Sequence, residues 1–259
     1  MRQMRHEVIS SRSNPLVTRL RKLGSKRSAR REEGVFVGEG PKLLQEAVRW
    51  RIPLETVVYA SGVTLPQLPD DVRMVEVPDS LLEAVAQTQT PQGVVFVCRT
   101  PALELPEQLT GNRYLILDGL QDPGNVGTIW RTADAFGADG LILCSGCADP
   151  WSPKTVRSTM GAAFRLPVWE CTLEQAAARL RAADIPLYAT ALQEDTVDVR
   201  QVSLTRSGVI IGSEGRGVSD LSLQLCEKTV KIPMVERCES LNAAVAASVV
   251  LWEMARDQL

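Results

Sequence analysis

The amino-acid sequence predicts an α/β protein with a parallel sheet in its C-terminal half and a smaller α/β domain before it. Short apolar segments alternate with helical patterns along the whole chain, which is typical of this class. In the second half the apolar segments are continuous, as expected of strands that are buried on both faces of a parallel sheet. Residues 101–112 hold two prolines and a glycine without clear periodicity, which indicates a linker. We therefore expect domains at 1–100 and 113–259.

The bulk composition is that of a globular protein. Of the 259 residues 44% are hydrophobic, so a packed core is expected. No apolar run reaches the length of a membrane span, and the charged N-terminus is followed by no apolar stretch that could form a signal peptide. These features favour a cytoplasmic protein without a membrane partner.

The charge is distributed unevenly along the chain. Residues 1–31 contain ten Arg and Lys and one acidic residue, Glu7, which gives this segment a charge of +9. Because the whole chain carries −2, the remainder carries −11. A basic segment on an acidic body favours a polyanionic partner, most simply a nucleic acid. The alternative is a solvated, mobile terminus, because blocks of like charge are often disordered.

The N-terminal half shows a compact alternation of elements. Asn14 is suited to cap a helix that begins at Pro15, and Leu16, Leu20 and Leu23 fall on one face of it, with the basic residues directed elsewhere. Further on we expect strands at 35–37, 56–60, 72–77 and 93–98, and helices at 41–50 and 80–86.

The second half alternates in the same way. Expected strands lie at 114–118, 141–144, 167–169, 187–191, 209–212 and 230–233. Helices are expected near 126–136, 153–161, 173–183, 218–225 and 240–257.

Six cysteines and a single histidine limit the metal chemistry. Cys144 and Cys147 have the spacing of a redox or metal pair, but there is no second pair, and His6 is far away in sequence. The sequence therefore does not favour a four-ligand zinc site. Small residues that close a strand are the favoured interpretation, since cytosolic thiols usually stay reduced.

Polar residues gather in three turns, each between a predicted strand and a predicted helix. The first is D-P-G-N-V-G-T-I-W-R-T (122–132), in which Asn125 is suited to cap a helix and Arg131 follows just under two turns later. A capped helix with a surface arginine would explain this turn equally well.

The second turn is G-S-E-G-R-G (212–217), whose glycines allow close approach of a ligand to the backbone. Its spacing differs from that of a dinucleotide-binding loop, and Glu214 would repel a pyrophosphate. An adenosine or a ribose hydroxyl suits it better, and an ordinary tight turn is the alternative.

The third turn, E-S-L-N (239–242), opens a helix rich in small residues and apolar on several sides. Such a helix is typically buried, in part against another subunit. A plain core helix would explain the alanines but not the polar residues. Because backbone N–H groups lack partners where a helix begins, the three turns together predict one site for a polar ligand.

At these residues the chain resembles the SpoU (TrmH-like) branch of the SPOUT superfamily, the RNA ribose 2′-O-methyltransferases. The resemblance covers residues 114–258 and rests on the three turns in order, with S-P-K-T-V-R-S-T-M-G-A (152–162) as further support. More loosely, S-R-S-N-P-L-V, R-R-E-E-G-V-F-V-G-E-G and T-Q-T-P-Q-G-V are similar to the RNA-binding domain often attached to these enzymes.

The resemblance implies a catalytic domain with a deep C-terminal trefoil knot, one of the few exceptions to the rule against knots. It also implies a homodimer, and the cofactor S-adenosyl-L-methionine held without a metal. The residues implied to bind the cofactor are Thr190, Ala191, Gly212, Ser213, Gly215, Ile232, Met234 and Leu241.

The resemblance assigns the chemistry to Arg131, with Asn125, Glu214, Ser240 and Asn242 around it. Arg131 is expected to activate the ribose hydroxyl. Because a guanidinium stays protonated near neutral pH, stabilising the developing alkoxide or holding a phosphate is the alternative role. Asn125 is expected to orient Arg131, and Glu214 to fix the guanidinium. Asn242 and Ser240 are expected to order the loop over the methyl donor.

The basic segment and the N-terminal domain favour ribosomal RNA as the substrate, with transfer RNA as the alternative. A non-catalytic RNA-binding protein is a second hypothesis, but all polar residues of the motifs are present. A nucleotide-dependent oxidoreductase is a third, which the glycine spacing disfavours.

Overall fold

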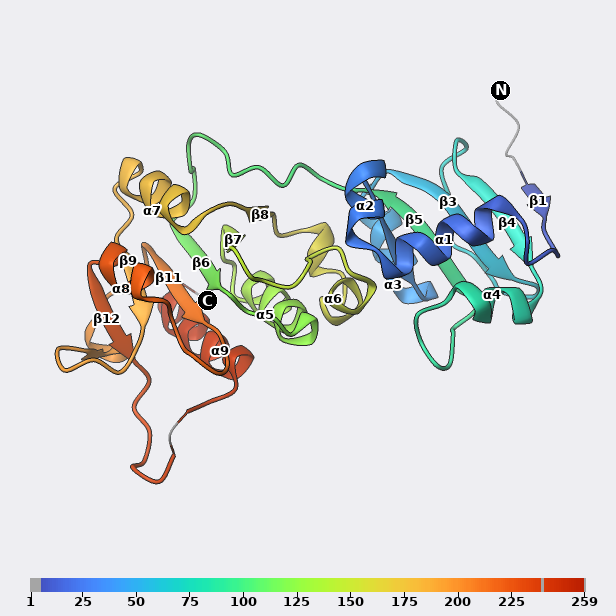
Figure 1. Ribbon diagram of the computed structural model, residues 1–259. Helices are drawn as coiled ribbons and strands as arrows, with labels where there is room; N and C mark the ends of the chain where they lie inside the picture. Colours follow the sequence, from blue (N-terminus) through green and yellow to red (C-terminus); the bar gives the residue numbers. More distant parts are fainter. Residues whose placement is uncertain (1–5, 239, 259) are drawn as a thin grey trace. The chain divides into compact units, whose positions relative to one another are not determined.

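The computed structural model describes residues 6–238 and 240–258 of the chain (Figure 1). Contacts divide it into two compact units, one of residues 1–101 with Asp149–Phe164, the other of residues 102–148 with Arg165–Leu259. The segment Asp149–Phe164 thus belongs by packing to the first unit, although chain order places it within 113–259. Each unit is described by itself.

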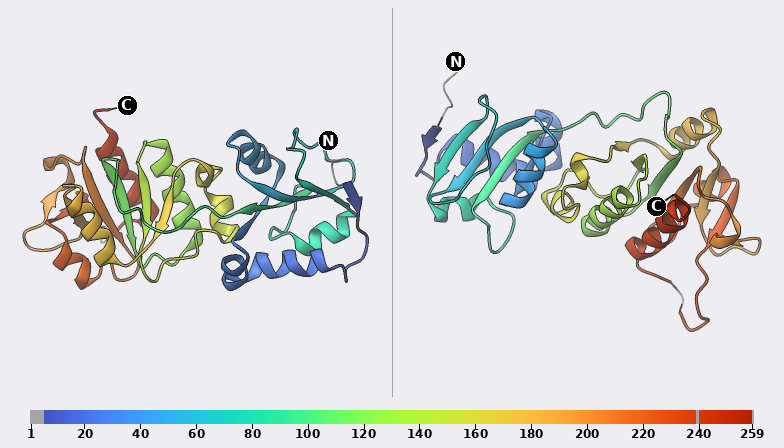
Figure 2. Two further views of the ribbon diagram at one scale, coloured as in Figure 1. Left: turned by 90° about the horizontal axis from the view of Figure 1, so that it is seen from above. Right: turned by 180° about the vertical axis from the view of Figure 1, so that it is seen from behind.

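The first unit is built on a five-stranded mixed sheet in the order β1-β4-β3-β5-β2. In it β1 and β3 run parallel to β4, whereas β5 is antiparallel to both β3 and β2. Helices α1 and α4 cover one face of this sheet and α3 the other (Figure 2). The strands are β1 (His6–Val8), β2 (Val35–Glu39), β3 (Leu54–Ala60), β4 (Arg73–Val77) and β5 (Val94–Arg99), and the helices are α1 (Pro15–Ser25), α2 (Arg27–Glu33), α3 (Pro41–Arg49), α4 (Asp79–Val85) and, from the later segment, α6 (Pro153–Ser158) and η1 (Ala162–Phe164).

Helix α1 begins as the sequence predicts. The Asn14 side chain accepts a hydrogen bond from Leu16 N at 2.9 Å, and Pro15 occupies the first turn. Leu16, Leu20 and Leu23 are buried in the core of this unit.

The basic segment differs in part from its predicted form, in which Arg19, Arg21, Lys22 and Lys26 face outward. The Arg19 guanidinium pairs with Glu33 and Glu55, which raises the pKa of Arg19 through these hydrogen bonds, first of all that to Glu55. Arg30 is buried, with 5% of its surface exposed. Two of the cations therefore neutralise acids of the same unit, because their long side chains reach acids elsewhere in the fold.

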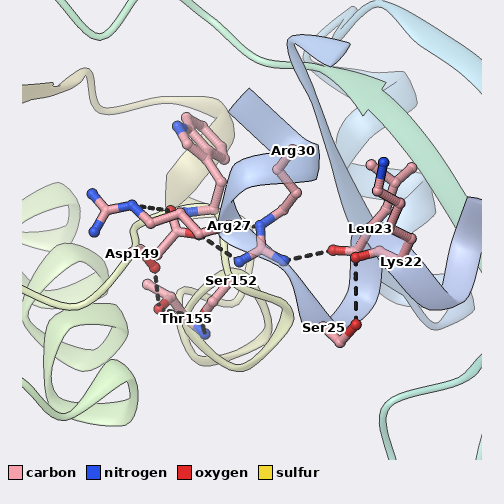
Figure 3. A network of polar contacts seen from close by, with 9 residues as sticks. Lys22, Leu23, Ser25, Arg27, Arg30, Asp149, Ser152 and Thr155 are labelled. Carbon is pink, nitrogen blue, oxygen red and sulfur yellow. Dashed lines mark hydrogen bonds and ion pairs between the residues drawn. The ribbon is translucent and has the colours of Figure 1, made fainter. Parts of the chain in front are cut away.

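Arg30 holds the segment Asp149–Phe164 in place (Figure 3). Its Nη2 donates to Asp149 Oδ2 at 2.5 Å and its Nη1 to the Leu23 carbonyl at 2.5 Å. On the same segment the Trp151 ring packs on Phe36 with centroids 4.5 Å apart. A buried ion pair and an aromatic pair thus join α2 and β2 to the chain before α6.

The second unit contains a seven-stranded sheet in the order β10-β12-β9-β11-β6-β7-β8, and every pair in it is parallel. Helices α7 and α8 pack on one side of it, and α5 and α9 pack together on the other (Figure 2). The elements are β6 (Arg113–Asp118), α5 (Pro123–Ala135), β7 (Gly140–Leu143), β8 (Val168–Glu170), α7 (Leu173–Ala182), β9 (Leu187–Thr190), β10 (Val197–Asp198), η2 (Val199–Gln201), β11 (Ser207–Gly212), α8 (Asp220–Leu225), β12 (Lys228–Lys231) and α9 (Ala243–Ala255). The α/β class and the parallel sheet are confirmed.

Helix α5 begins earlier than predicted. Asp122, not Asn125, caps it, since the Asp122 side chain accepts a hydrogen bond from Asn125 N at 2.8 Å. Pro123 fits the first turn because its missing N–H would have no helical partner there. The side chain of Asn125 is therefore left for other contacts.

Within the part of the chain that the structure describes, no helix has both the length and the apolar character needed to cross a bilayer.

Candidate active site

A cavity of about 500 Å³ lies at the carboxyl ends of three neighbouring strands of the second unit. Its walls come from the loops after β9, β11 and β12 and from the start of α9. The carboxyl edge of a parallel sheet is where α/β proteins commonly bind ligands.

The second and third turns of the sequence analysis both contribute to this cavity, together with the end of β9. All eight residues predicted to bind the cofactor line it, as do Glu214 and Ser240 from the predicted catalytic set: Thr190, Ala191, Gly212, Ser213, Glu214, Gly215, Ile232, Met234, Ser240 and Leu241. Glu239 lies outside the described residues.

The loop after β11 is closed on itself. Ser213 N donates to the Gly217 carbonyl and Gly217 N to the Ser213 carbonyl, both at 2.9 Å. A Cβ on Gly212 would lie 2.0 Å from Gly217 C and 2.1 Å from Val218 N, so only glycine allows this approach. The loop thereby presents Glu214, Gly215 and Arg216 as an exposed tip.

The end of β9 is tied to both of its neighbours. Thr190 Oγ1 donates to the Ile210 carbonyl at 2.9 Å, and Ala191 N donates to the Val230 carbonyl at 3.1 Å. These bonds fix the strand end that forms one wall of the cavity.

Three predicted catalytic residues form a hydrogen-bonded chain. Asn242 Nδ2 donates to Asn125 Oδ1 at 3.3 Å, and Asn125 Nδ2 donates to Glu214 Oε1 at 2.7 Å. Since a carboxylate only accepts, the amide of Asn125 must turn its nitrogen toward Glu214. The first, second and third turns, which are far apart in sequence, therefore meet at one place.

The Asn242 side chain also caps a helix. Its Oδ1 accepts from Ala244 N at 2.9 Å and from Val245 N at 3.3 Å, which makes it the N-cap of α9. The same side chain thus fixes the start of α9 and joins the chain of polar contacts.

Arg131 lies apart from this chain. It is exposed on α5, and among residues 6–238 and 240–258 it has no hydrogen bond or ion pair. The expected contacts of Arg131 with Asn125 and Glu214 are not formed, because these two residues bond each other and because six residues of helix turn Arg131 away from the face of Asn125.

The cavity has the size and the apolar walls to take a nucleoside. Apolar walls from Ile211, Leu223, Val230, Ile232 and Leu241 fit a purine ring. Among the described residues no group of three or more His, Cys, Asp or Glu could hold a metal ion. Leu192, Gln193 and Leu223 also line the cavity and were not singled out from the sequence, although their closeness in sequence to the motifs is a usable signal.

Cys144 and Cys147 lie outside this cavity. Cys144 directly follows β7, and both thiols are free. Burial raises the pKa of Cys147 to about 11, so this thiol is protonated near neutral pH.

The sequence matches the models of two known protein families. The model of the SpoU rRNA Methylase family matches residues 112–252. The chain belongs to this family. A second model, the MRM3-like substrate binding domain, matches residues 14–95.

Curated relatives extend over nearly the whole chain. The 23S rRNA (guanosine(2553)-2′-O)-methyltransferase RlmP of Bacillus subtilis is 32% identical over 248 residues, covering 95% of this chain and 98% of the relative. The 23S rRNA (uridine(2479)-2′-O)-methyltransferase of Streptomyces viridochromogenes is 34% identical, covering 90% of this chain and 86% of the relative.

Solved structures agree with the fold. The AdoMet-bound rRNA methyltransferase from Sinorhizobium meliloti superposes with a TM-score of 0.87 at 31% identity, covering 98% of this chain and 99% of that one.

Proposed function

We propose that this protein transfers the methyl group of S-adenosyl-L-methionine to a ribose 2′-hydroxyl of ribosomal RNA. The carrying observation is the convergence of three polar turns, joined through Asn125, Glu214 and Asn242, beside a cavity of nucleoside size. Family membership and the relatives named as 23S rRNA 2′-O-methyltransferases support the reaction and favour ribosomal over transfer RNA.

The cavity residues would bind the cofactor largely through backbone groups. The closed loop at Gly212 brings main chain to the cavity wall without a side chain in between. Apolar residues such as Ile232 and Leu241 would cover the adenine. The sulfonium of the bound cofactor supplies the electrophilic methyl carbon, so the protein need only orient and stabilise the reacting groups.

In the reaction the ribose oxygen forms a bond to the methyl carbon while the carbon–sulfur bond breaks, and the hydroxyl proton leaves to solvent. A guanidinium acts as a cation and hydrogen-bond donor rather than as a base, so Arg131 is not given the role of proton acceptor. Its exposed guanidinium, which has no hydrogen bond or ion pair among the described residues, is suited to hold the phosphate beside the target ribose or to stabilise the developing alkoxide. The chain from Asn242 through Asn125 to Glu214 would fix the loops around the methyl donor, with Ser240 at the same rim.

A trefoil knot is part of this proposal. The chain leaves β12 on one side of β9 and returns as α9, which packs on β11 and α5 on the other side of β9. In the proposal this returning segment also passes through a loop of the preceding chain, which would form the knot. The proposal also keeps the cytoplasmic location. It assigns RNA binding to residues 1–100 and methyl transfer to residues 113–259 apart from Asp149–Phe164, which packs with the first unit.

We propose a homodimer formed through α9. Val245 and Trp252 on this helix are exposed by 50% and 47%, and Leu241 just before it by 36%, which is unusual for large apolar side chains so close together in sequence. Sedimentation equilibrium tests this: a dimer is expected, and Trp252→Glu should give monomers. A monomeric wild-type protein would refute the proposal.

The test of the activity uses transcribed ribosomal and transfer RNA, which carry no methyl groups, with labelled cofactor and mapping of 2′-O-methylation. Label is expected at one ribosomal position. Arg131→Ala should lower the methyl-transfer rate by about a hundredfold or more and leave cofactor affinity within about twofold in calorimetry. Arg181→Ala, an exposed arginine on α7, is the matched control and should stay active. A fully active Arg131→Ala protein would remove the assignment.

A further inference from the structure

The first unit contains a cavity of its own, of about 700 Å³, far larger than one water molecule requires. It lies at the start of α3, beside the loop between α4 and β5, and is bordered by α6 and the residues after it. Most of the residues that line it carry polar or charged side chains: Glu39, Gly40, Lys42, Leu43, Gln45, Glu46, Thr88, Thr90, Gln92, Arg157 and Met160.

The start of α3 leaves donors without partners at this cavity. Gly40 is the N-cap and offers no side-chain cap, and its own N–H donates to the Val94 carbonyl at 2.9 Å. Pro41 has no N–H. The N–H groups of Lys42 and Leu43 precede the first intrahelical bond, from Leu44 N to the Gly40 carbonyl at 3.1 Å. Among the residues that the structure describes, these two N–H groups have no hydrogen-bond partner, and they lie at the positive end of the helix dipole.

Arg157 adds a second, independent donor. Its Nη1 is buried and has no hydrogen-bond partner in the part of the chain that the structure describes. Arg157 itself lines the cavity, so its positive charge lies beside the start of α3. Arg157 reaches the cavity from α6, which the Arg30–Asp149 ion pair holds on this unit (Figure 3).

The two acidic side chains that line the cavity already have partners within the protein. Glu39 accepts from Gln87 N at 2.9 Å and from the Thr88 hydroxyl. Glu46 lies 3.7 Å from Arg49. By contrast, Lys42 is exposed and, within the described residues, has no ion pair. In the described part of the chain neither Lys42 nor Arg157 has an ion pair, and together with the N–H groups at the start of α3 they favour an anion at this place.

The other walls indicate that the ligand is more than a simple anion. Gln45 and Gln92 carry amides and Thr90 a hydroxyl, which can pair with the edge of a base. Met160 is 55% exposed and has a φ of 50°, a strained backbone for a side chain of this size. Its polarisable thioether could cover a base.

We infer that this cavity takes one unstacked nucleotide of the RNA substrate. The phosphate would lie at the start of α3 between Lys42 and Arg157, and the base would lie among the amides under Met160. This inference rests on the proposed function, since it takes RNA as the substrate. The cavity would be a second site of contact between the protein and the RNA, separate from the residues that line the cavity of the methyltransferase unit.

The first test measures equilibrium binding of transcribed ribosomal RNA to Lys42→Gln and Arg157→Gln variants. Each should bind about five- to tenfold more weakly. The slope of the logarithm of affinity against the logarithm of salt concentration should fall in magnitude by about one. Arg99→Gln removes an exposed arginine of the same unit that does not line the cavity, and should behave like the wild type.

Kinetics separate recognition from chemistry. For both variants KM for the RNA should rise while kcat at saturating RNA and cofactor affinity stay unchanged. Unchanged melting temperatures would exclude misfolding of the variants. Because Lys42 is exposed, we expect Lys42→Gln to perturb the fold less than Arg157→Gln.

Ultraviolet crosslinking of the bound transcript supplies an independent readout. Crosslinked peptides should include 88–92 or Met160, and inorganic phosphate at millimolar concentration should compete only weakly. Wild-type affinity in both variants, or crosslinks confined to other segments, would overturn the inference. Tight binding of phosphate with no effect of the variants on RNA would overturn it as well.

The experiments distinguish failure of the proposed function from failure of the nucleotide site. If the wild-type protein transfers no methyl group to any RNA but the variants still weaken RNA binding, the proposed function fails and the nucleotide site stands. If methyl transfer proceeds with unchanged KM in the variants, the site fails and the function stands.

Discussion

The loop that follows β11 depends on the absence of a side chain at Gly212. Its backbone touches that of Gly217 and Val218 so closely that a Cβ would overlap both, and the overlap is with main chain rather than with a movable side chain. Gly215, three residues further, has open space around it and no such constraint. Two glycines of one motif thus have different physical roles.

This difference predicts different results for two alanine variants. Gly212→Ala should force the loop open, lower the free energy of unfolding by about 1–3 kcal/mol and weaken cofactor binding by about tenfold or more. Gly215→Ala should change the free energy of unfolding by less than about 0.5 kcal/mol. Chemical denaturation and calorimetry with the cofactor measure both. Equal cofactor affinity in the two variants would contradict the role given to Gly212.

Several contacts of the site could not be read from the sequence. The spacing of the motifs identifies Asn125, Glu214 and Asn242 as polar residues at strand ends, but not which of them bond each other. The expected pairing of Glu214 with Arg131 is replaced by a bond to Asn125. The cap of α5 was also misplaced, because Asp122 and Asn125 are both good capping residues and only the backbone decides between them.

At the scale of elements, α6 shows how long-range packing decides where a segment belongs. In sequence it follows β7 of the second unit, yet Arg30 and Phe36 hold the chain before it on the first. The Asp149 side chain is 12% exposed and that of Arg30 is 6% exposed, so neither charge is well hydrated. Each therefore depends on the other.

Removing one partner of this pair should destabilise the protein strongly. Arg30→Met leaves the carboxylate without its main cation and should lower the free energy of unfolding by about 3 kcal/mol. The double variant Arg30→Met, Asp149→Asn removes both charges and keeps an oxygen for Trp151 N, which donates to Asp149 Oδ1 at 3.1 Å. It should recover much of the loss. Denaturation of the four proteins of this cycle measures the coupling, and additive effects would contradict it.

Most strands and helices were predictable from alternating apolar runs, with ends shifted by one to three residues. The elements that were not predicted show no such pattern of apolar residues. Helix α2 consists largely of charged residues with only Ala29 and Arg30 buried, so no apolar stripe marks it. The strands β1 and β10, of three and two residues, are too short for any period to appear.

For the whole molecule, the first unit should be incomplete without its later segment. A fragment of residues 1–101 leaves Phe36 and Arg30 without Trp151 and Asp149. Joining residues 149–164 to this fragment through a flexible glycine–serine linker should raise its melting temperature, on the order of 10 °C. Thermal unfolding followed by circular dichroism provides the comparison. Equal melting temperatures for the two fragments would show that the segment adds nothing to this unit.

The same division into units has a consequence for biosynthesis. When Pro101 leaves the ribosome, the first unit still lacks Asp149–Phe164, and β6, α5 and β7 of the other unit must be translated before this segment arrives. The nascent chain therefore holds an unfinished N-terminal half, with the face that will receive Trp151 open, while translation continues. Chaperones that bind emerging polypeptides would meet this half at that stage, and completion of one unit is coupled in time to synthesis of the other.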